Sequence, residues 1–273
     1  MSQIAVVTIV AGRRAHLARQ LEGLRRQRRT ADQLVIVRMD GLAVDLGPDA
    51  AGTVTVVDVP VDPLHPQRLP LAAARNRGVW ATDAETVVLL DVDCIPGAGL
   101  VAAYAQAETV DGLLCGSVRY LEPDRPGPNW TESDLQAASA PHPARPAPGP
   151  GRLVREDRHE LAWTTSLALR RDLFERVGGF DERFSGYGGE DTDFAVRARQ
   201  AGLGVWWSDD AVAYHQHHAS QNPPTQHLVD IVRNAGLFAE LHGWYPMQGW
   251  LEEFRRRELI DFDPEAGRLA VRA

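Results

Sequence analysis

The sequence predicts an α/β fold in which helices cover both faces of a mostly parallel central sheet, followed by a helical C-terminal tail. Two observations support this prediction. Continuous apolar runs, typical of strands buried on both faces, occur at 4–10, 34–37, 53–59 and 86–90. Helical segments lie between the first and second runs and between the third and fourth. Strands and helices that alternate at this spacing form open, mostly parallel sheets.

Each helical segment has its own signal. The first places Leu17, Leu21 and Leu24 on one stripe, and the second, at 71–81, is rich in alanine. The later elements that we expect are a helix near 98–107, a strand at 113–118, a strand at 162–170, a helix at 171–179 ended by Gly178 or Gly179, a helix at 191–202, short strands at 205–207 and 211–215, and helices from 225 onward.

Residues 121–152 interrupt this pattern. They contain eight prolines, so we expect no regular element there. A structureless stretch of this length inside a domain is either a functional loop or an insertion that tolerates any sequence. The chain therefore divides into 1–120, the loop 121–152, a second half at 153–222 and a C-terminal extension at 223–273.

Composition excludes several classes of function. The formal net charge of -8 argues against nucleic acid or an anionic membrane as the main partner. All 29 basic residues are arginine, which indicates a GC-rich coding bias of the kind found in some bacteria. The N-terminus has neither the basic start of a secretory signal nor a spanning apolar run, so we expect a soluble, cytoplasmic protein. Cys94 and Cys115 are expected to be reduced, packed thiols.

Two aspartates follow the fourth strand. In an extended chain Asp91 and Asp93 point the same way, so both carboxylates face one ligand if the strand geometry continues through Val92. Paired oxygen donors suit Mg²⁺ or Mn²⁺. The alternative is a solvated turn, in which aspartate is common.

A glycine-rich segment, "GGFDERFSGYGGEDTDF", brings Glu190, Asp191 and Asp193 together. A carboxylate here can act as a general base towards an attacking hydroxyl. The alternative is that Asp191 or Thr192 is the N-cap of the following helix.

Histidines form the third cluster, in "AVAYHQHH". On an extended segment His215 and His217 share a face, and neutral imidazole is a good ligand for Mn²⁺. Alone, such a cluster is more often a surface feature. With the acidic clusters upstream, a shared metal site becomes plausible, and His215 is the first candidate.

These motifs together resemble the nucleotide-sugar glycosyltransferases of the GT-A (Rossmann-like) fold, of the family 2 type, with a galactosyltransferase-like GGED region. The similar segments are "VVTIVAGRRAHL", "AAARNRGVWAT", "VVLLDVDCIPG" and "FSGYGGEDTDFAVRARQAG", and they occur in the family's order. The resemblance implies that 1–120 binds the nucleotide sugar and that 153–222 forms the acceptor and catalytic half. The loop 121–152 is then a candidate acceptor lid.

The resemblance also implies site residues and a mechanism. Asp191 is the expected base of an inverting sugar transfer, with Glu190 holding a sugar. A metal, Mn²⁺ or Mg²⁺, would be bound by Asp93, His215 and His217. The expected donor contacts are Thr8, Val10, Arg13, Asp40, Arg75, Asp91 and Val92. The expected acceptor contacts are Trp163, Tyr187, Gly188 and Gly189.

The partners expected on the same basis are a UDP-sugar donor, or a GDP-sugar as second choice, and an acceptor with a free hydroxyl such as a small molecule, glycan or peptide. The base preference is open because Met39 stands where the family usually has an acid, which leaves only Asp40. The aromatic C-terminal helices offer a surface for a homodimer. Two other functions fit less well: a sugar-nucleotide nucleotidyltransferase, which normally has a lysine near its N-terminus, and a non-catalytic sugar-nucleotide-binding protein of the same fold.

Overall fold

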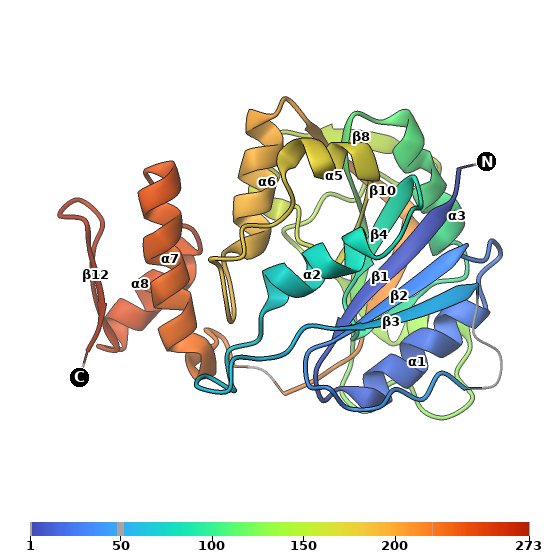
Figure 1. The fold of residues 1–273 in the computed structure, drawn as a ribbon, viewed down its shortest axis with the longest axis horizontal. Coiled ribbons are helices and arrows are strands. Elements are labelled where there is room, and N and C mark those ends of the chain that lie inside the picture. The colour runs from blue at the N-terminus through green and yellow to red at the C-terminus, as the bar shows by residue number, and fades with distance from the viewer. Residues whose placement is uncertain (1, 48–51, 220, 273) are drawn as a thin grey trace.

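The computed structural model describes residues 2–47, 52–219 and 221–272, and its centre is a ten-stranded mixed sheet (Figure 1). Eight strands form a continuous path in the order β3-β2-β1-β4-β9-β6-β10-β5, while β7 pairs with β6 and β8 with β10. Their bounds are β1 Ile4–Val10, β2 Gln33–Arg38, β3 Thr53–Asp58, β4 Thr86–Leu90, β5 Cys94–Pro96, β6 Gly112–Leu121, β7 Ser139–Pro141, β8 Leu153–Glu156, β9 Ser166–Arg170 and β10 Gly204–His215.

Strand direction follows the prediction in the core of the sheet. β3, β2, β1 and β4 are parallel neighbours, and β6 is parallel to β10. β9 lies between these two groups and is antiparallel to both β4 and β6. The carboxyl ends of the parallel strands therefore meet at one edge, which is where ligands bind in open α/β sheets.

Helices cover both faces of the sheet, as predicted, and each face has its own core. α1 (Arg14–Arg25) and α3 (Leu100–Tyr104) pack on one face. α2 (Leu71–Trp80), α5 (Arg171–Val177) and α6 (Glu190–Gln200) pack on the other. The predicted stripe of Leu17, Leu21 and Leu24 is buried in the first core. Cys94 and Cys115 are free and buried, as expected.

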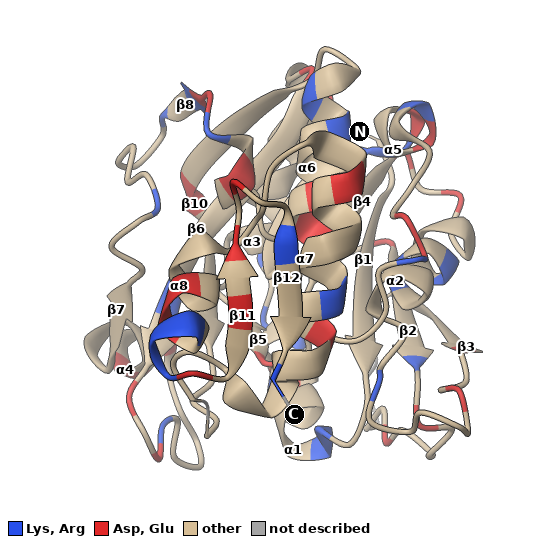
Figure 2. Ribbon diagram, turned by 90° about the vertical axis from the view of Figure 1, so that its left-hand side faces the viewer, with Lys and Arg blue, Asp and Glu red and all other residues tan. Residues whose placement is uncertain are grey.

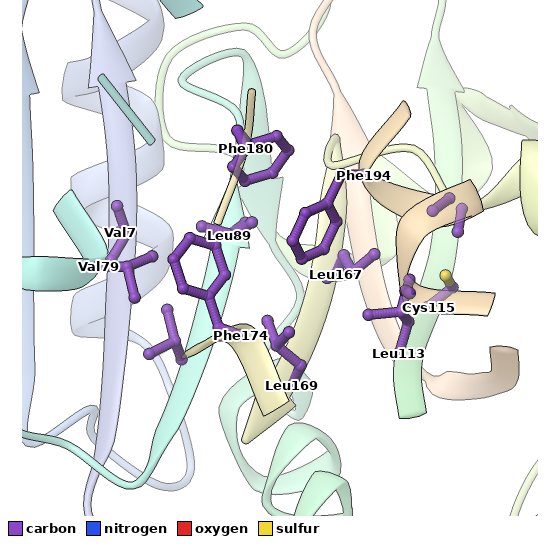
Figure 3. Packing of buried hydrophobic residues seen from close by; sticks show 14 of the residues in the cluster. Val7, Val79, Leu89, Leu113, Cys115, Leu167, Leu169, Phe174, Phe180 and Phe194 are labelled. Atoms are coloured by element: carbon purple, nitrogen blue, oxygen red, sulfur yellow. The ribbon is translucent and has the colours of Figure 1, made fainter. Parts of the chain in front are cut away.

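Three phenylalanines anchor the segment that precedes α6 (Figure 3). The rings of Phe180 and Phe194 are stacked with centroids 4.4 Å apart, and Phe174 lies 5.9 Å and 5.6 Å from them. All three are buried beside leucines of β4 and β9. Gly178 ends α5 in the left-handed conformation, as predicted. Because packed aromatic rings leave little freedom, this cluster fixes where α6 begins.

The helix α2 lies unusually close to the sheet at Gly78. A Cβ added there would stand 2.3 Å from Cγ1 of Val7 and 3.0 Å from Cγ2 of Val37. Only glycine permits this approach. The close contact sets the depth of α2 and of Arg75, which α2 carries into the site.

The proline-rich stretch is more regular than predicted. It contains α4 (Glu132–Ala137) and the strand β7. Thr131 and Asp134 form a capping box at the start of α4, and all eight prolines lie outside 129–140. The prediction of no regular element is therefore wrong for 132–141, whereas 142–152 contains no helix or strand.

The two predicted strands near 205–215 are one long strand, β10, which is interrupted by a bulge between Ser208 and Val212. The expected strand at 162–170 begins only at Ser166. Three short 3₁₀ helices connect other elements: Ala105–Thr109, His159–Leu161 and Thr225–His227.

The C-terminal extension has a small core of its own. Its helices α7 (Leu228–His242) and α8 (Gln248–Arg256) were expected, but they are followed by a hairpin of β11 (Ile260–Asp263) and β12 (Arg268–Val271). The prediction of helices alone is wrong for these strands. In Figure 1 the extension forms the left-hand part of the molecule, next to α6. Figure 2 shows acidic and basic segments interspersed along the ribbon.

Candidate functional site

The two aspartates after β4 diverge. The strand ends at Leu90, and the Cys94 N–H donates to the Asp91 carbonyl at 2.9 Å, which closes a turn around Val92. The extended geometry that we expected through Val92 is therefore absent. Asp91 and Asp93 instead belong to two separate groups of side chains.

The first group combines a carboxylate with two imidazoles. His215 Nε2 and His218 Nε2 each lie 3.5 Å from a carboxylate oxygen of Asp93. One ligand atom from each of the three residues lies within 4.8 Å of the others, the spacing needed to hold one metal ion. The structure brings His218 into this group in place of His217, whose side chain is exposed. The chain leaves the strand after His215, so the two-residue alternation on which His217 was chosen no longer applies.

The ionisation of this group suits a cation. Burial alone would raise the pKa of Asp93, but the hydrogen bond from His218 and the charges of His215 and Arg13 lower it to about 2. Burial lowers the pKa of His215. An ionised carboxylate and a neutral imidazole are the forms that bind metals. Arg13, on the loop after β1, forms an ion pair with Asp93 and supplies the positive charge there.

The second group surrounds Arg75. Its guanidinium lies 3.2 Å from Asp91, 3.1 Å from Glu190 and 3.6 Å from Asp191. The Arg75 side chain is only 6% exposed, so its positive charge is occupied by these three carboxylates. The expected contact of Arg75 with the donor stays a prediction. In the structure Arg75 connects the turn after β4 to the start of α6.

Three carboxylates surround one cation, which leaves an excess of negative charge. The pKa values of two of these carboxyl groups are raised. Burial raises the pKa of Glu190 to about 7, the charge of Asp191 adds to the rise, and Arg75 opposes it. Burial likewise raises the pKa of Asp91 to about 6 against the charge of Arg75. This group therefore holds a proton near neutral pH.

Asp191 is held by the segment before β9. It accepts hydrogen bonds from the Thr164 hydroxyl at 2.7 Å and the Thr164 N–H at 3.1 Å. Its side chain is 21% exposed, against 8% for Glu190. Gly189 is the N-cap of α6, so the alternative in which Asp191 or Thr192 caps the helix is wrong. Asp191 is the more accessible carboxylate at the helix N-terminus.

The third acid of this segment has a different environment. Asp193 is fully buried, forms an ion pair with Arg197 at 2.8 Å, and makes a hydrogen bond of 2.9 Å with His242 Nε2. It therefore attaches α6 to α7 and lies outside the site.

The donor-side candidates gather at the ends of β1 and β2. Asp40 accepts hydrogen bonds from the N–H groups of Gly12 at 2.7 Å and Leu42 at 3.0 Å, so it ties these two loops together. A cavity of about 410 Å³ lies between α1 and the chain at 40–47, and Val10 and Asp40 line it. The side chains of Thr8 and Val92 are buried, and their expected contacts to the donor stay predictions.

The acceptor-side candidates separate into exposed and buried residues. Tyr187 is 39% exposed, and its ring is stacked on that of His227. Trp163 is half-buried, and its indole lies 5.2 Å from the His142 ring. Gly189 is buried with a φ of 95°, and a Cβ there would stand 3.2 Å from the Phe184 ring. Glycine is therefore required for the backbone at this position, and the expected acceptor contacts stay predictions.

Helix α7 holds the loop that carries Tyr187 and Gly188. The Asn234 side chain is fully buried and donates to the carbonyls of Ser185, Tyr187 and Gly188 at 3.2, 3.3 and 2.7 Å. Sequence analysis assigned no site role to Asn234 or Thr164, whose contacts join segments far apart in the chain, so no local pattern marks them. His218 belongs to the predicted histidine cluster "AVAYHQHH" but was not selected as a metal ligand.

Comparisons with known proteins support the resemblance. A family model described as the N-terminal domain of galactosyltransferase matches residues 158–219, which include Glu190, Asp191 and His215. An N-acetylglucosaminyl-diphospho-decaprenol L-rhamnosyltransferase of Mycobacterium tuberculosis is 28% identical over 149 residues, which are 53% of this chain and 44% of the relative. The chain thus spans less than half the length of that relative.

Solved structures confirm the expected fold. A crystal structure of S. aureus TarS 1–349 has a TM-score of 0.56 at 14% identity and covers 87% of this chain and 64% of that chain. A crystal structure of GalNAc-T7 with UDP, GalNAc and Mn²⁺ has a TM-score of 0.55 at 13% identity and covers 94% of this chain and 57% of that chain. No helix in the described residues is both long and apolar enough to span a bilayer.

Proposed function

We propose that this protein is a metal-dependent inverting glycosyltransferase that moves a sugar from a nucleoside-diphosphate sugar to an acceptor hydroxyl. One observation carries the proposal. Asp93 of the metal-type group and Asp91 of the Arg75-bound carboxylates lie on the same short turn after β4, which supports a site in which a donor held by one group faces the other.

Asp93, His215 and His218 would hold the metal. One carboxylate and two imidazoles suit Mn²⁺ better than Mg²⁺, which prefers oxygen donors, and three protein ligands leave positions open for diphosphate oxygens. When bound, the metal would neutralise negative charge on the leaving diphosphate. Arg13 provides positive charge at the same carboxylate and would move aside or share the diphosphate.

Asp191 is the proposed base. It is the more exposed of the two carboxylates at the start of α6, and Thr164 fixes its orientation. Deprotonation of the acceptor hydroxyl by Asp191 would generate the nucleophile as the bond to the diphosphate breaks, so the anomeric configuration inverts. Glu190 and Asp91, both held by Arg75, would bind the hydroxyls of the donor sugar.

For the donor and the acceptor we propose chemical classes and not single compounds. The UDP complex of GalNAc-T7 and a UDP-GlcNAc complex of S. aureus TarS support a UDP-sugar as first choice. The cavity beside Val10 and Asp40 is the proposed nucleotide site. The name of the mycobacterial relative supports a hydroxyl on a glycan carried by a diphosphate as one acceptor to test. A cytoplasmic location and a homodimer through the C-terminal extension stay predictions.

The test is direct. Purified protein is incubated with Mn²⁺ and a panel of nucleotide sugars, and the released nucleoside diphosphate is measured. We expect Asp93→Asn to lose most of the turnover, and the turnover that remains should not depend on Mn²⁺. The matched control His217→Ala should keep both the turnover and its dependence on Mn²⁺. Release of pyrophosphate in place of a nucleoside diphosphate would support the nucleotidyltransferase alternative. Unchanged metal dependence in Asp93→Asn would refute the metal site.

A further inference from the structure

Arg145, in the proline-rich loop, has a buried guanidinium that forms no ion pair with any residue that the structure describes. All three of its guanidinium nitrogens are inaccessible to solvent and have no hydrogen-bond partner among the described residues. The guanidinium lies 4.7 Å from the Trp163 ring centroid and 5.6 Å from that of Trp207. Aromatic faces attract a cation, but they satisfy none of its five N–H donors.

Such an arrangement is costly, because buried charges in native proteins are normally paired. The nearest loop anchors do not supply the missing anion. Asp209 accepts from the Gly149 N–H at 2.7 Å, and Asp210 accepts from the Gly151 N–H at 2.9 Å. These two carboxylates fasten the end of the loop to the bulge of β10. The unpaired guanidinium thus indicates a partner that belongs to a ligand.

A series of ring contacts connects Arg145 to the proposed site through Trp163. His142 lies against Trp163 at 5.2 Å and Tyr120 at 5.7 Å, and Tyr120 lies against the metal-group residue His215 at 4.8 Å.

The loop is built so that this segment can rearrange while its ends stay fixed. β7, which ends at Pro141, pairs with β6, and Gly149 and Gly151 are tied to β10. Five prolines occur in 141–150, and each lacks an N–H. The segment between the anchors therefore has few backbone hydrogen bonds to lose.

We propose that Arg145 is a phosphate-binding residue, stored between Trp163 and Trp207 in the free protein and delivered to a substrate phosphate by the loop. The phosphate belongs either to the donor diphosphate or to the acceptor. The planar guanidinium pairs with a phosphate through two hydrogen bonds and leaves the tryptophans. The assignment of the phosphate to a sugar-transfer substrate rests on the proposed function, whereas the anion site itself does not.

The first experiment measures inorganic pyrophosphate binding by calorimetry in the presence of a metal chelator, together with the melting temperature of the free protein. Arg145→Met should weaken pyrophosphate binding about 10- to 100-fold, as expected for loss of charge-assisted hydrogen bonds. It should also raise the melting temperature, because an apolar side chain suits that packing better than an unpaired charge. Arg145→Lys should retain part of the affinity. The exposed Arg152→Met is the matched control and should change neither value.

Pyrophosphate binding decides the proposal. If Arg145→Met binds pyrophosphate as the wild type does, or if the wild type binds none, the proposal is wrong at any melting temperature. A lower melting temperature of Arg145→Met would then identify Arg145 as a packing residue. Pyrophosphate binding that depends on Arg145 supports the proposal even if no sugar transfer is ever found. A second titration, into protein saturated with UDP and Mn²⁺, separates the sources. Binding of pyrophosphate that persists indicates an acceptor phosphate, and competition with UDP indicates the donor diphosphate.

Discussion

The replacement Glu190→Gln removes the carboxylate that shares Arg75 with Asp91 and Asp191. Fully ionised, the group would contain one positive and three negative charges in a largely buried place. Burial, together with the negative charge of Asp191, raises the pKa of Glu190 from an ordinary 4.5 to about 7. Glutamine keeps the size of the side chain and an oxygen that can accept from Arg75, but it cannot bind the proton.

The sign of the effect follows from proton counting. Between pH 4.5 and pH 7 the unfolded chain has lost the Glu190 proton while the folded protein retains it. The stabilisation from this group is therefore complete below its unfolded pKa and is lost as the pH rises through its folded pKa. At about 1.4 kcal/mol for each unit, the loss amounts to roughly 3 kcal/mol, most of it between pH 5 and pH 8. The Glu190→Gln variant lacks this dependence.

The assay is denaturant unfolding followed by tryptophan fluorescence at several pH values from 5 to 8, in a metal chelator. We expect the free energy of unfolding of the wild type to fall with pH more steeply than that of Glu190→Gln, by about 2–3 kcal/mol over this range. Glu240→Gln, at an exposed position on α7, is the control and should follow the wild type. Parallel curves for the wild type and Glu190→Gln would refute the argument.

Two further predictions concern the elements that position the site. Gly78→Ala places a Cβ 2.3 Å from Val7, so we expect a loss of about 1–3 kcal/mol in denaturant unfolding, and an unchanged midpoint would show that α2 can shift without cost. Asn234→Leu leaves the carbonyls of Tyr187 and Gly188 unpaired, so we expect a loss of about 1–3 kcal/mol together with faster proteolysis of the loop around Tyr187. Stability equal to the wild type in Asn234→Leu would contradict that bracing role.

The sequence predicted those parts of the molecule that depend on local patterns. Continuous apolar runs identified β1, β2, β3 and β4, and the stripe that contains Leu17 identified α1. The capping box at Thr131 was equally local and readable, but the neighbouring prolines outweighed it. The hairpin of β11 and β12 was missed because each strand has only four residues, too few for alternation to be distinguished from one turn of a helix.

The sequence predicted candidate site residues within single short segments, but it did not predict the contacts between segments. The structure divides the five selected residues between two groups, Asp93 with His215 and Asp91 with Glu190 and Asp191, and this division could not be read from the chain. That Arg75 joins Asp91 to Glu190 depends on contacts across 16 and 115 residues. The choice of His217 over His218 failed because it assumed a strand that had already ended.

The turn around Val92 explains why two aspartates so close in sequence can serve opposite electrostatic roles. It directs Asp93 to the histidines and Arg13, where the pKa falls to about 2, so a metal ligand there is ionised at every physiological pH. It directs Asp91 to the crowded carboxylates around Arg75, where the pKa rises to about 6. The charge of Asp93 is one of the causes that raise the pKa of Asp91, so a cation bound at Asp93 would offset that charge and lower the proton affinity of Asp91. Metal binding by the first group and ionisation of Asp91 in the second would then be coupled.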